Sequence, residues 1–414
     1  MGETLKKQSG KGWLAFLTLA LLLGAALRLV HPGDIEYKDD ERYIFEATQK
    51  VGLTEPWPSL GMVSGVGGVR NPGMSVWIFV GLTRIIHATT PPELARGVEL
   101  LNILALLLLA FFSLHLLPEV ERPPWLWATA FAAVNPFAVL FDRKIWAQST
   151  LPLLCVLMWM AWHYRHKRAG AFFWGLLGIC AGQIHMSGFF LPAGVFLWTF
   201  LHDRKAKWGS WLLGSLAGFI PLIPWLQYMA TKPPGGPSSL SPSWILYPKY
   251  WIFWATDSVG LGLAYNLRTH QFMDFLRYPL IGNTPTYLVG VLHLVVLVAG
   301  IYLLVSAVRK DVVFRGIGDK SETGLALHSV LIATGLLMTL SCIEVCRHYL
   351  IMTFPLEWVW LSRLGEGGAG LNQRTLAVIW SAQLLITALV LYYLHVNHGA
   401  PLGYYGMAYQ YQLH

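Results

Sequence analysis

The chain has 414 residues, of which 55% are hydrophobic, 14% are aromatic and only 13% are charged. A soluble domain carries about 25% charged residues, so this composition excludes a set of water-soluble domains. Apolar runs of membrane-spanning length recur as far as residue 395, which excludes a secreted domain behind a single signal peptide. The net charge of +8 fits cytoplasmic loops rich in Lys and Arg, and we do not expect nucleic acid as a partner.

Eleven apolar runs are long enough to cross about 30 Å of hydrocarbon. In chain order they are 12–30, 98–117, 124–141, 146–163, 170–185, 187–201, 208–229, 286–308, 323–344, 348–362 and 375–395. A further run, from Met74 to Ala88, is about fifteen residues long and carries Arg84. The sequence therefore predicts an all-α polytopic membrane protein with about eleven transmembrane helices.

Basic residues indicate whether the run at 74–88 crosses the membrane. If it does not cross, and the N-terminus is cytoplasmic, five short loops and the N-terminus lie inside and hold 16 of the 30 Lys and Arg. These loops are 118–123, 163–169, 202–207, 309–320 and 363–374. If it crosses, the loops HYRHKRA and HDRKAK are exported, against the positive-inside rule. We therefore expect residues 75–88 to form an interfacial helix.

This topology predicts one transmembrane domain over residues 1–414 with two large outer segments. The first outer loop, 31–97, carries an acidic motif and interfacial helices. The second, 230–285, begins with the stretch Lys232–Ser243, whose Pro, Gly and Ser content predicts irregular structure. We assign no task to the Tyr-rich C-terminus. The four cysteines are expected to be small apolar core residues rather than metal or redox groups, and they are Cys155, Cys180, Cys342 and Cys346.

Acidic residues gather where the first outer loop leaves the membrane. Six of the 22 carboxylates fall between His31 and Glu46. A solvated acidic loop is the plain interpretation. However, carboxylates gain nothing from anionic headgroups at the membrane surface, and this cluster contains its own Arg and two Tyr. If the segment is helical, one face carries Asp39, Arg42, Tyr43 and Glu46. The pattern favours a structured polar pocket.

Five segments of the chain carry recognisable motifs. They are Asp39-Asp40-x-Arg42-Tyr43 (D-E-x-R-Y), Arg70–Trp77 (K-P-P-L-x-x-W), Glu93–Arg96 (s-e-x-a-x-R), Asn135-Pro136 with Asp142–Lys144 (s-P…R), and Arg347–Leu350 with Pro355 (R-Y-x-x-P). These segments resemble motifs of the GT-C superfamily of membrane glycosyltransferases, which includes the protein O-mannosyltransferases and the bacterial transferases that put aminoarabinose on lipid A. The matches lie in the order of the family's motifs and cover about residues 12–160 and 340–362.

The resemblance implies the GT-C fold and the transfer of a sugar from a polyprenyl-phosphate carrier to an acceptor hydroxyl on the outer face of the membrane. It gives Asp39 the role of general base, with Asp40 as the alternative or as its partner. The sequence departs from the family at Asp40, where Glu is usual, and at Gln148, near which relatives often carry a carboxylate. Without that second acidic motif we expect no metal and no cofactor besides the lipid-linked sugar donor.

A polyprenyl-phosphate donor needs cations at the membrane surface, and an Arg fork grips phosphate oxygens in pairs. The expected carrier- and substrate-binding residues are Arg70, Arg143, Lys144, Arg347, Tyr43, His185 and Tyr349. For each cation the alternative is snorkelling to the interface. For His185 the alternative to a sugar or acceptor contact is an interhelical hydrogen bond.

Two other functions remain open at this stage. A transporter or flippase of lipid-linked oligosaccharides would carry internal repeats and polar groups at the membrane midplane, and the sequence shows no repeat. A polymerase or ligase that uses the same carrier would depend on outer-loop Arg residues without the acidic pair. We expect an integral protein of the bacterial inner membrane with its active site outside. The acceptor is a protein, a lipid or a glycan.

Overall fold

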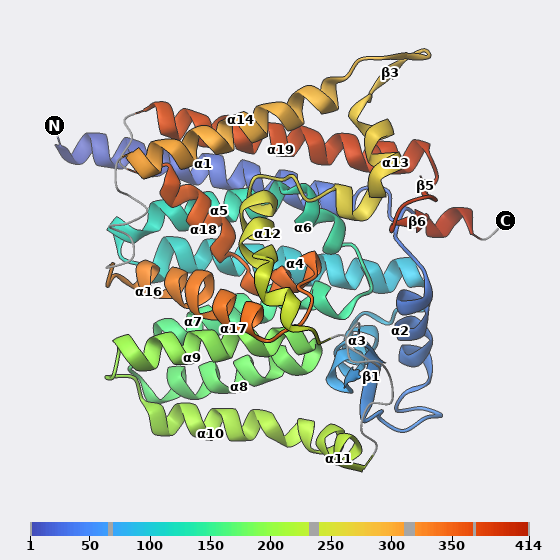
Figure 1. Ribbon diagram of the computed structural model, residues 1–414, viewed down its shortest axis with the longest axis vertical. Coiled ribbons are helices and arrows are strands. Elements are labelled where there is room, and N and C mark those ends of the chain that lie inside the picture. The colour runs from blue at the N-terminus through green and yellow to red at the C-terminus, as the bar shows by residue number, and fades with distance from the viewer. Residues whose placement is uncertain (1, 65–68, 232–239, 310–318, 367–369, 413–414) are drawn as a thin grey trace.

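The computed structural model describes residues 2–64, 69–231, 240–309, 319–366 and 370–412, which are folded mainly into helices (Figure 1). Three predicted features fall partly outside these residues, namely the irregular stretch Lys232–Ser243 and the basic loops 309–320 and 363–374. The long helices lie side by side along one direction, with the N-terminus at one end of the bundle and the C-terminus at the other. The chain is an integral membrane protein.

Each of the eleven apolar runs contains a helical segment. The main helices are α1 (Gly2–Leu29), α4 (Pro91–Phe111), α5 (Arg122–Val134), α6 (Pro136–Phe141), α7 (Leu151–His163), α8 (Arg168–Ile184), α9 (Phe190–His202), α10 (Trp208–Phe219), α11 (Ile223–Thr231), α14 (Leu288–Arg309), α16 (Glu322–His328), α17 (Gly335–Leu340), α18 (Leu356–Leu364) and α19 (Leu371–Val396). Among the described residues, six helical segments are long and apolar enough to cross a membrane. The expected number of eleven crossings stays a prediction.

Two of the predicted spans are interrupted by proline. The run 124–141 divides into α5 and α6 at Asn135. The Asn135 side chain caps α6 by accepting hydrogen bonds from the backbone N–H groups of Phe137 and Ala138. The run 348–362 begins as a 3-10 helix, η8 (Arg347–Thr353), and becomes α18 only after Pro355. Proline lacks the backbone N–H that a continuous helix requires, and it moves the preceding residue out of the helical region.

The short basic loops meet at one end of the bundle. The Arg165 guanidinium, between α7 and α8, lies 2.7 Å from Asp203 after α9 and 3.2 Å from Glu322 at the start of α16. Beside them, the Glu121 carboxylate before α5 accepts the Thr323 N–H at 2.8 Å. The N-terminus lies at this same end (Figure 1). The loops that the charge argument grouped together are therefore neighbours in space.

The first outer loop folds at the opposite end. It forms α2 (Asp39–Lys50), the antiparallel pair β1 (Leu60–Val63) and β2 (Arg70–Pro72), and α3 (Met74–Ile86). Thirteen residues make a helix of about 20 Å, too short to cross about 30 Å of hydrocarbon. α3 packs against α2 and α4 at this end, as an interfacial helix would.

The second outer segment and the C-terminal tail complete this end. The second segment forms η6 (Pro242–Leu246), α12 (Lys249–Ser258), α13 (Ala264–Leu276), β3 (Leu280–Ile281) and β4 (Thr284–Pro285). α12 packs against α17, α18 and η8 (Figure 1). After α19 the tail forms β5 (Gly399–Ala400), β6 (Gly406–Met407) and η9 (Tyr409–Tyr411). Backbone bonds from Tyr409 to Ile35 and from Tyr405 to Asn266 tie this tail to both outer segments.

Candidate active site

The start of α2 positions the acidic motif. Lys38 is the N-cap, and its backbone N–H donates to the Glu41 carboxylate at 3.0 Å, which closes a capping box. Carboxylates in the first helical turn are favoured by the positive end of the helix dipole. Asp39 and Asp40 are therefore held at the very start of α2, where the helix faces the turn that follows α6.

These carboxylates line a polar cavity of about 250 Å³ at the end of the bundle. Its walls come from the first outer loop, the turn after α6, α13 and the C-terminal tail. The lining residues are Glu36, Lys38, Asp39, Asp40, Glu41, Lys144, Trp146, Tyr265 and Tyr404. Ligand pockets are typically about 300–1,000 Å³, so this cavity has room for a single sugar ring rather than for a long glycan.

Asp40 is the better oriented of the two aspartates. Its Oδ2 accepts a hydrogen bond from the Trp146 indole N–H at 3.0 Å. Desolvation raises the pKa of Asp40 from 3.8, while the Trp146 bond and the Lys144 charge partly oppose that rise. Asp39 lines the same cavity, and both aspartates are exposed residues, so the Trp146 bond is what distinguishes Asp40. A carboxylate that is oriented by a hydrogen bond and has a raised pKa suits the role of a proton acceptor.

Lys144 brings a positive charge to the floor of the cavity. Its Nζ lies 2.6 Å from the Glu36 carboxylate, which also contacts Lys38 at 2.8 Å. The ammonium group lies 4.9 Å from the Phe141 ring centre and 4.7 Å from that of Trp146. Burial and the Glu36 charge raise the pKa of the neighbouring Glu41 to about 7. The cavity therefore holds several carboxylates around one buried cation.

An aromatic wall closes the other side of the cavity. The Tyr265 ring is stacked on Tyr404 at 5.4 Å between ring centres, and its hydroxyl is hydrogen-bonded to His348 Nδ1 at 2.8 Å. The His348 ring lies 4.8 Å from Trp146, and Arg268 lies over Tyr404 at 4.1 Å. Flat aromatic faces beside carboxylates and cations are the surfaces on which sugar rings stack.

Arg347 lies next to this wall, directly before His348. Its guanidinium donates to the Asp257 carboxylate and, at 3.0 Å, to the Thr256 hydroxyl, both on α12. Thr256 also lines an apolar groove of about 150 Å³ between α12, α14 and α18. Arg347 is therefore a cation that is hydrogen-bonded to one residue of a groove lined mainly by apolar side chains.

The other predicted residues lie around this cavity. Arg143 is buried, and its guanidinium donates to the backbone carbonyls of Leu27 at 3.1 Å and His31 at 2.9 Å. These bonds brace the end of α1, and Arg143 does not line the cavity. His185 is hydrogen-bonded to Ser187 at 2.7 Å and packs 5.3 Å from the Tyr349 ring.

Arg70 and Tyr43 form a separate pair on the exposed side of α2. The Arg70 Nε donates to the Gly61 carbonyl at 2.9 Å, and its Nη2 reaches the Tyr43 hydroxyl at 3.4 Å. Tyr43 lies one helical turn after Asp39 and Asp40, and its side chain is exposed. Arg70 therefore stands near the acidic turn without lining the cavity.

Six cavity residues were not expected from the sequence as site residues, and they are Glu36, Lys38, Glu41, Trp146, Tyr265 and Tyr404. Glu36 stood out only as one member of the acidic cluster. Trp146 follows the turn motif Asp142–Lys144 by two positions, and that closeness was a usable signal. The two tyrosines come from segments that carry no recognisable motif.

The arrangement of the helices matches a known fold. The crystal structure of ArnT from Cupriavidus metallidurans bound to undecaprenyl phosphate superimposes with a TM-score of 0.51 at 14% sequence identity, and the match covers 92% of this chain and 63% of that one. The chain has the GT-C fold. The expected all-helical GT-C architecture is confirmed, and the segment 31–97 contains the helices α2 and α3.

A second GT-C structure, the apo oligosaccharyltransferase of Archaeoglobus fulgidus, matches with a TM-score of 0.47 at 14% identity over 96% of this chain and 56% of that one. The chain thus spans less than two thirds of the length of either structure. No protein-family model matches the chain, and no curated protein matches it in sequence. The likeness concerns the GT-C fold, and the chemistry has to be argued from the cavity.

Proposed function

We propose that the protein is a GT-C glycosyltransferase that moves a sugar from a polyprenyl-phosphate carrier to an acceptor hydroxyl at the outer face of the membrane. The observation that carries this proposal is the polar cavity at the start of α2, which combines Asp39 and Asp40 with the Lys144 cation and an aromatic wall. ArnT, which shares the fold, was crystallised with undecaprenyl phosphate, a carrier of this class.

Asp40 is the general base of the proposed reaction, and Asp39 is its neighbour at the cavity mouth. This reverses the order that the motif resemblance gave. Trp146 fixes one oxygen of Asp40 at 3.0 Å, which orients the other oxygen to take the proton of an acceptor hydroxyl. The hydroxyl oxygen then attacks the anomeric carbon, the bond from that carbon to the phosphate oxygen breaks, and the carrier leaves as a phosphate monoester.

Lys144 and Arg347 are the proposed phosphate contacts. Both are already paired with carboxylates, Lys144 with Glu36 at 2.6 Å and Arg347 with Asp257. A phosphate group entering beside them gains a cation that is held in place and needs no reorganisation. Arg347 also stands at the apolar groove between α12, α14 and α18, where the prenyl tail is proposed to lie.

Tyr265 and Tyr404 are the proposed platform for the transferred sugar or the acceptor sugar. Tyrosine presents a flat apolar face for the C–H side of a sugar ring and a hydroxyl for its polar edge. The neighbouring Arg268 and His348 hold the two rings in place. Because Tyr404 comes from the C-terminal tail, the cavity is complete only when that tail is docked.

Replacing the two aspartates one at a time tests this assignment. Asp40→Asn keeps the shape and removes the base, so the transfer rate should fall by about 10²–10⁴-fold. Asp39→Asn should retain more activity than Asp40→Asn. Asp274→Asn, an exposed carboxylate on α13 outside the cavity, is the matched control and should leave the rate unchanged. Activity of Asp40→Asn within about threefold of the wild type would contradict the assignment, since even the smallest expected loss is far larger.

A further inference from the structure

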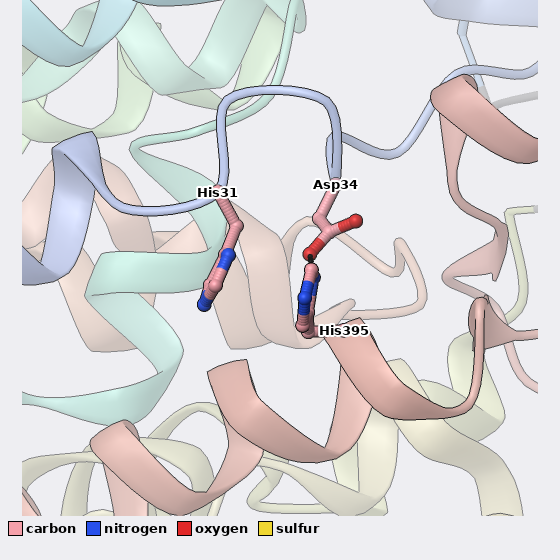
Figure 2. Close-up of side chains that lie close together, drawn as sticks. All are labelled: His31, Asp34 and His395. Atoms are coloured by element: carbon pink, nitrogen blue, oxygen red, sulfur yellow. Dashed lines mark hydrogen bonds and ion pairs between the residues drawn. The ribbon is translucent and has the colours of Figure 1, made fainter.

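Outside the polar cavity, three potential metal ligands meet where α1 ends and α19 ends. Figure 2 shows His31 and Asp34 on the turn after α1, and His395 on α19 facing them. One ligand atom from each residue lies within 4.8 Å of the other two. His395 Nδ1 is 2.7 Å from Asp34 Oδ2, and the His31 and His395 rings are stacked at 3.8 Å between centres.

The backbone holds this cluster in place. His31 adopts a left-handed conformation with φ of 50°, and the Asp34 N–H donates to its carbonyl at 3.0 Å, which closes a tight turn. The turn brings residues three apart to the same side of the chain. The Asp34 side chain is only 3% exposed, and Gln410 of the tail donates to its Oδ1. The remaining oxygen, Oδ2, faces His395.

We propose that His31, Asp34 and His395 bind one divalent transition-metal ion of the zinc class. Two imidazoles and one carboxylate are a ligand set that Zn²⁺ accepts, with a water in the fourth tetrahedral position. With metal–ligand bonds of about 2.0–2.2 Å, tetrahedral ligand atoms stand about 3.3 Å apart. His395 Nδ1 and Asp34 Oδ2 are 2.7 Å apart, and all three ligand atoms lie within 4.8 Å of one another. The ion replaces the proton that His395 and Asp34 share.

Binding requires one side-chain movement. Stacked rings, inclined here by only 19°, cannot both direct their in-plane lone pairs at one ion, so one ring has to turn. His395 has room for this because its side chain is 38% exposed. The Asp34 carboxylate keeps its orientation through Gln410, as a metal-binding carboxylate normally does through an outer hydrogen bond.

The ion would join the start of the first outer loop to the C-terminal tail. Asp34 already contacts the tail at Tyr405, which donates to its carbonyl, and at Gln410. The tail supplies Tyr404 to the polar cavity. Metal binding should therefore stabilise the docked tail, and this expectation holds whether or not the proposed sugar transfer is correct.

Titration of the chelator-stripped protein with Zn²⁺ tests the site. We expect one equivalent to bind, the midpoint of thermal unfolding to rise, and the segment 399–412 to become better protected from hydrogen exchange. His31→Asn, which suits the left-handed backbone, and His395→Gln should each weaken binding by at least about tenfold. His395→Cys, which restores a zinc ligand, should recover binding.

The control is His398→Gln, an exposed histidine three residues after His395 whose ring packs on Tyr411. This variant should bind Zn²⁺ like the wild type. Circular dichroism and the unfolding midpoint without metal show whether each variant is folded. Absence of stoichiometric binding by the wild type would overturn the site. So would binding that is unchanged in folded His31→Asn and His395→Gln, since the ion would then be adventitious.

Discussion

Asp39 and Asp40 are consecutive carboxylates that meet different surroundings. Successive side chains on a helix point about 100° apart, so only one of the two meets the turn after α6. Asp40 meets Trp146 there, whereas Asp39 lines the same cavity without this contact. A motif match assigns a role to a position in the sequence, but the partner of each carboxylate decides which one is the better base.

The pH dependence of activity should report on Trp146. Asp40 acts as a base only when it is deprotonated, so activity falls as the pH drops through its pKa. The Trp146 N–H lowers this pKa by stabilising the carboxylate, and removing it raises the pKa further. Trp146→Phe should therefore move the acid limb of kcat/KM to higher pH, by about one to two units for a hydrogen bond to a charged group.

The matched control is Trp57→Phe, because Trp57 is an exposed tryptophan in the loop that carries Asp40, and its ring packs on Trp77. Its acid limb should coincide with that of the wild type. An acid limb in Trp146→Phe that stays at the wild-type position would show that Asp40 is not the group that titrates.

Arg347 should govern donor affinity. Loss of a charge-assisted hydrogen bond costs about 1.5–3 kcal/mol, so Arg347→Ala should raise the donor KM by roughly ten- to hundredfold. Arg347→Lys should recover only part of the lost donor affinity, since an ammonium group does not reproduce the two parallel hydrogen bonds of a guanidinium. Removing Arg347 also deprives Asp257 of its cation, so the alanine change is best paired with Asp257→Asn. Donor titrations measure both effects.

Arg277→Ala is the control for this series, because Arg277 is an exposed arginine on the same side that pairs with Asp274. If the donor KM is unchanged in Arg347→Ala and Asp257→Asn/Arg347→Ala, Arg347 is a structural ion-pair partner and the phosphate contact is wrong. Arg143 is an example of such a structural arginine, because its Nη1 and Nη2 donate to backbone carbonyls.

At the scale of elements, the positions of the helices could be predicted and their interruptions could not. Long apolar runs mark helices because the bilayer requires about twenty apolar residues with internal hydrogen bonds. Asn135-Pro136 and Pro355 lie inside such runs, and hydropathy does not register the missing N–H of a proline. These two breaks matter for the candidate site. α6 leads into the turn that places Lys144 in the cavity, and η8 contains His348, which is hydrogen-bonded to Tyr265 of the aromatic wall.

Asn135 stabilises the break between α5 and α6, and its replacement tests this contribution. Its Oδ1 caps α6, and its Nδ2 donates to the Asp257 carbonyl on α12 at 2.9 Å. Asn135→Ala should lower the free energy of unfolding by about 1–3 kcal/mol, because it removes the cap and leaves a buried carbonyl without that donor. Asn135→Ser, which restores the cap alone, should be intermediate. Thermal unfolding in detergent measures this order, and equal stability of all three proteins would contradict it.

At the scale of the whole molecule, the basic loops and the candidate site lie at opposite ends. From this arrangement the positive-inside rule predicts that the polar cavity faces the outer side of the membrane. In intact cells, cysteines at Asp40 and Thr269 should react with an impermeant thiol reagent, and a cysteine at Lys205 should not. All three positions are exposed, so accessibility within the fold is matched. Labelling of the wild type measures the background reaction of its four native cysteines. If only Lys205→Cys is labelled, the orientation in the membrane is opposite to the predicted one.

The cavity also shows what a single sequence does not reveal. Its acidic half lies in one short segment and was found, because consecutive charged residues stand out in an apolar chain. Its aromatic half comes from Trp146, Tyr265 and Tyr404, in three segments separated by more than a hundred residues each. The chain has 19 Trp and 17 Tyr, so no single one is conspicuous before folding brings them together.

Transfer of the sugar from its carrier to an acceptor can be measured directly with a labelled sugar. Purified protein in lipid is given a panel of polyprenyl-phosphate sugars labelled in the sugar, together with cell-envelope acceptors. We expect one donor to be consumed, with release of free polyprenyl phosphate and appearance of the label on an acceptor hydroxyl, and Asp40→Asn should prevent both. If a labelled carrier crosses the bilayer with its sugar still attached, or if no donor is consumed while the protein is folded, the glycosyltransferase account is contradicted.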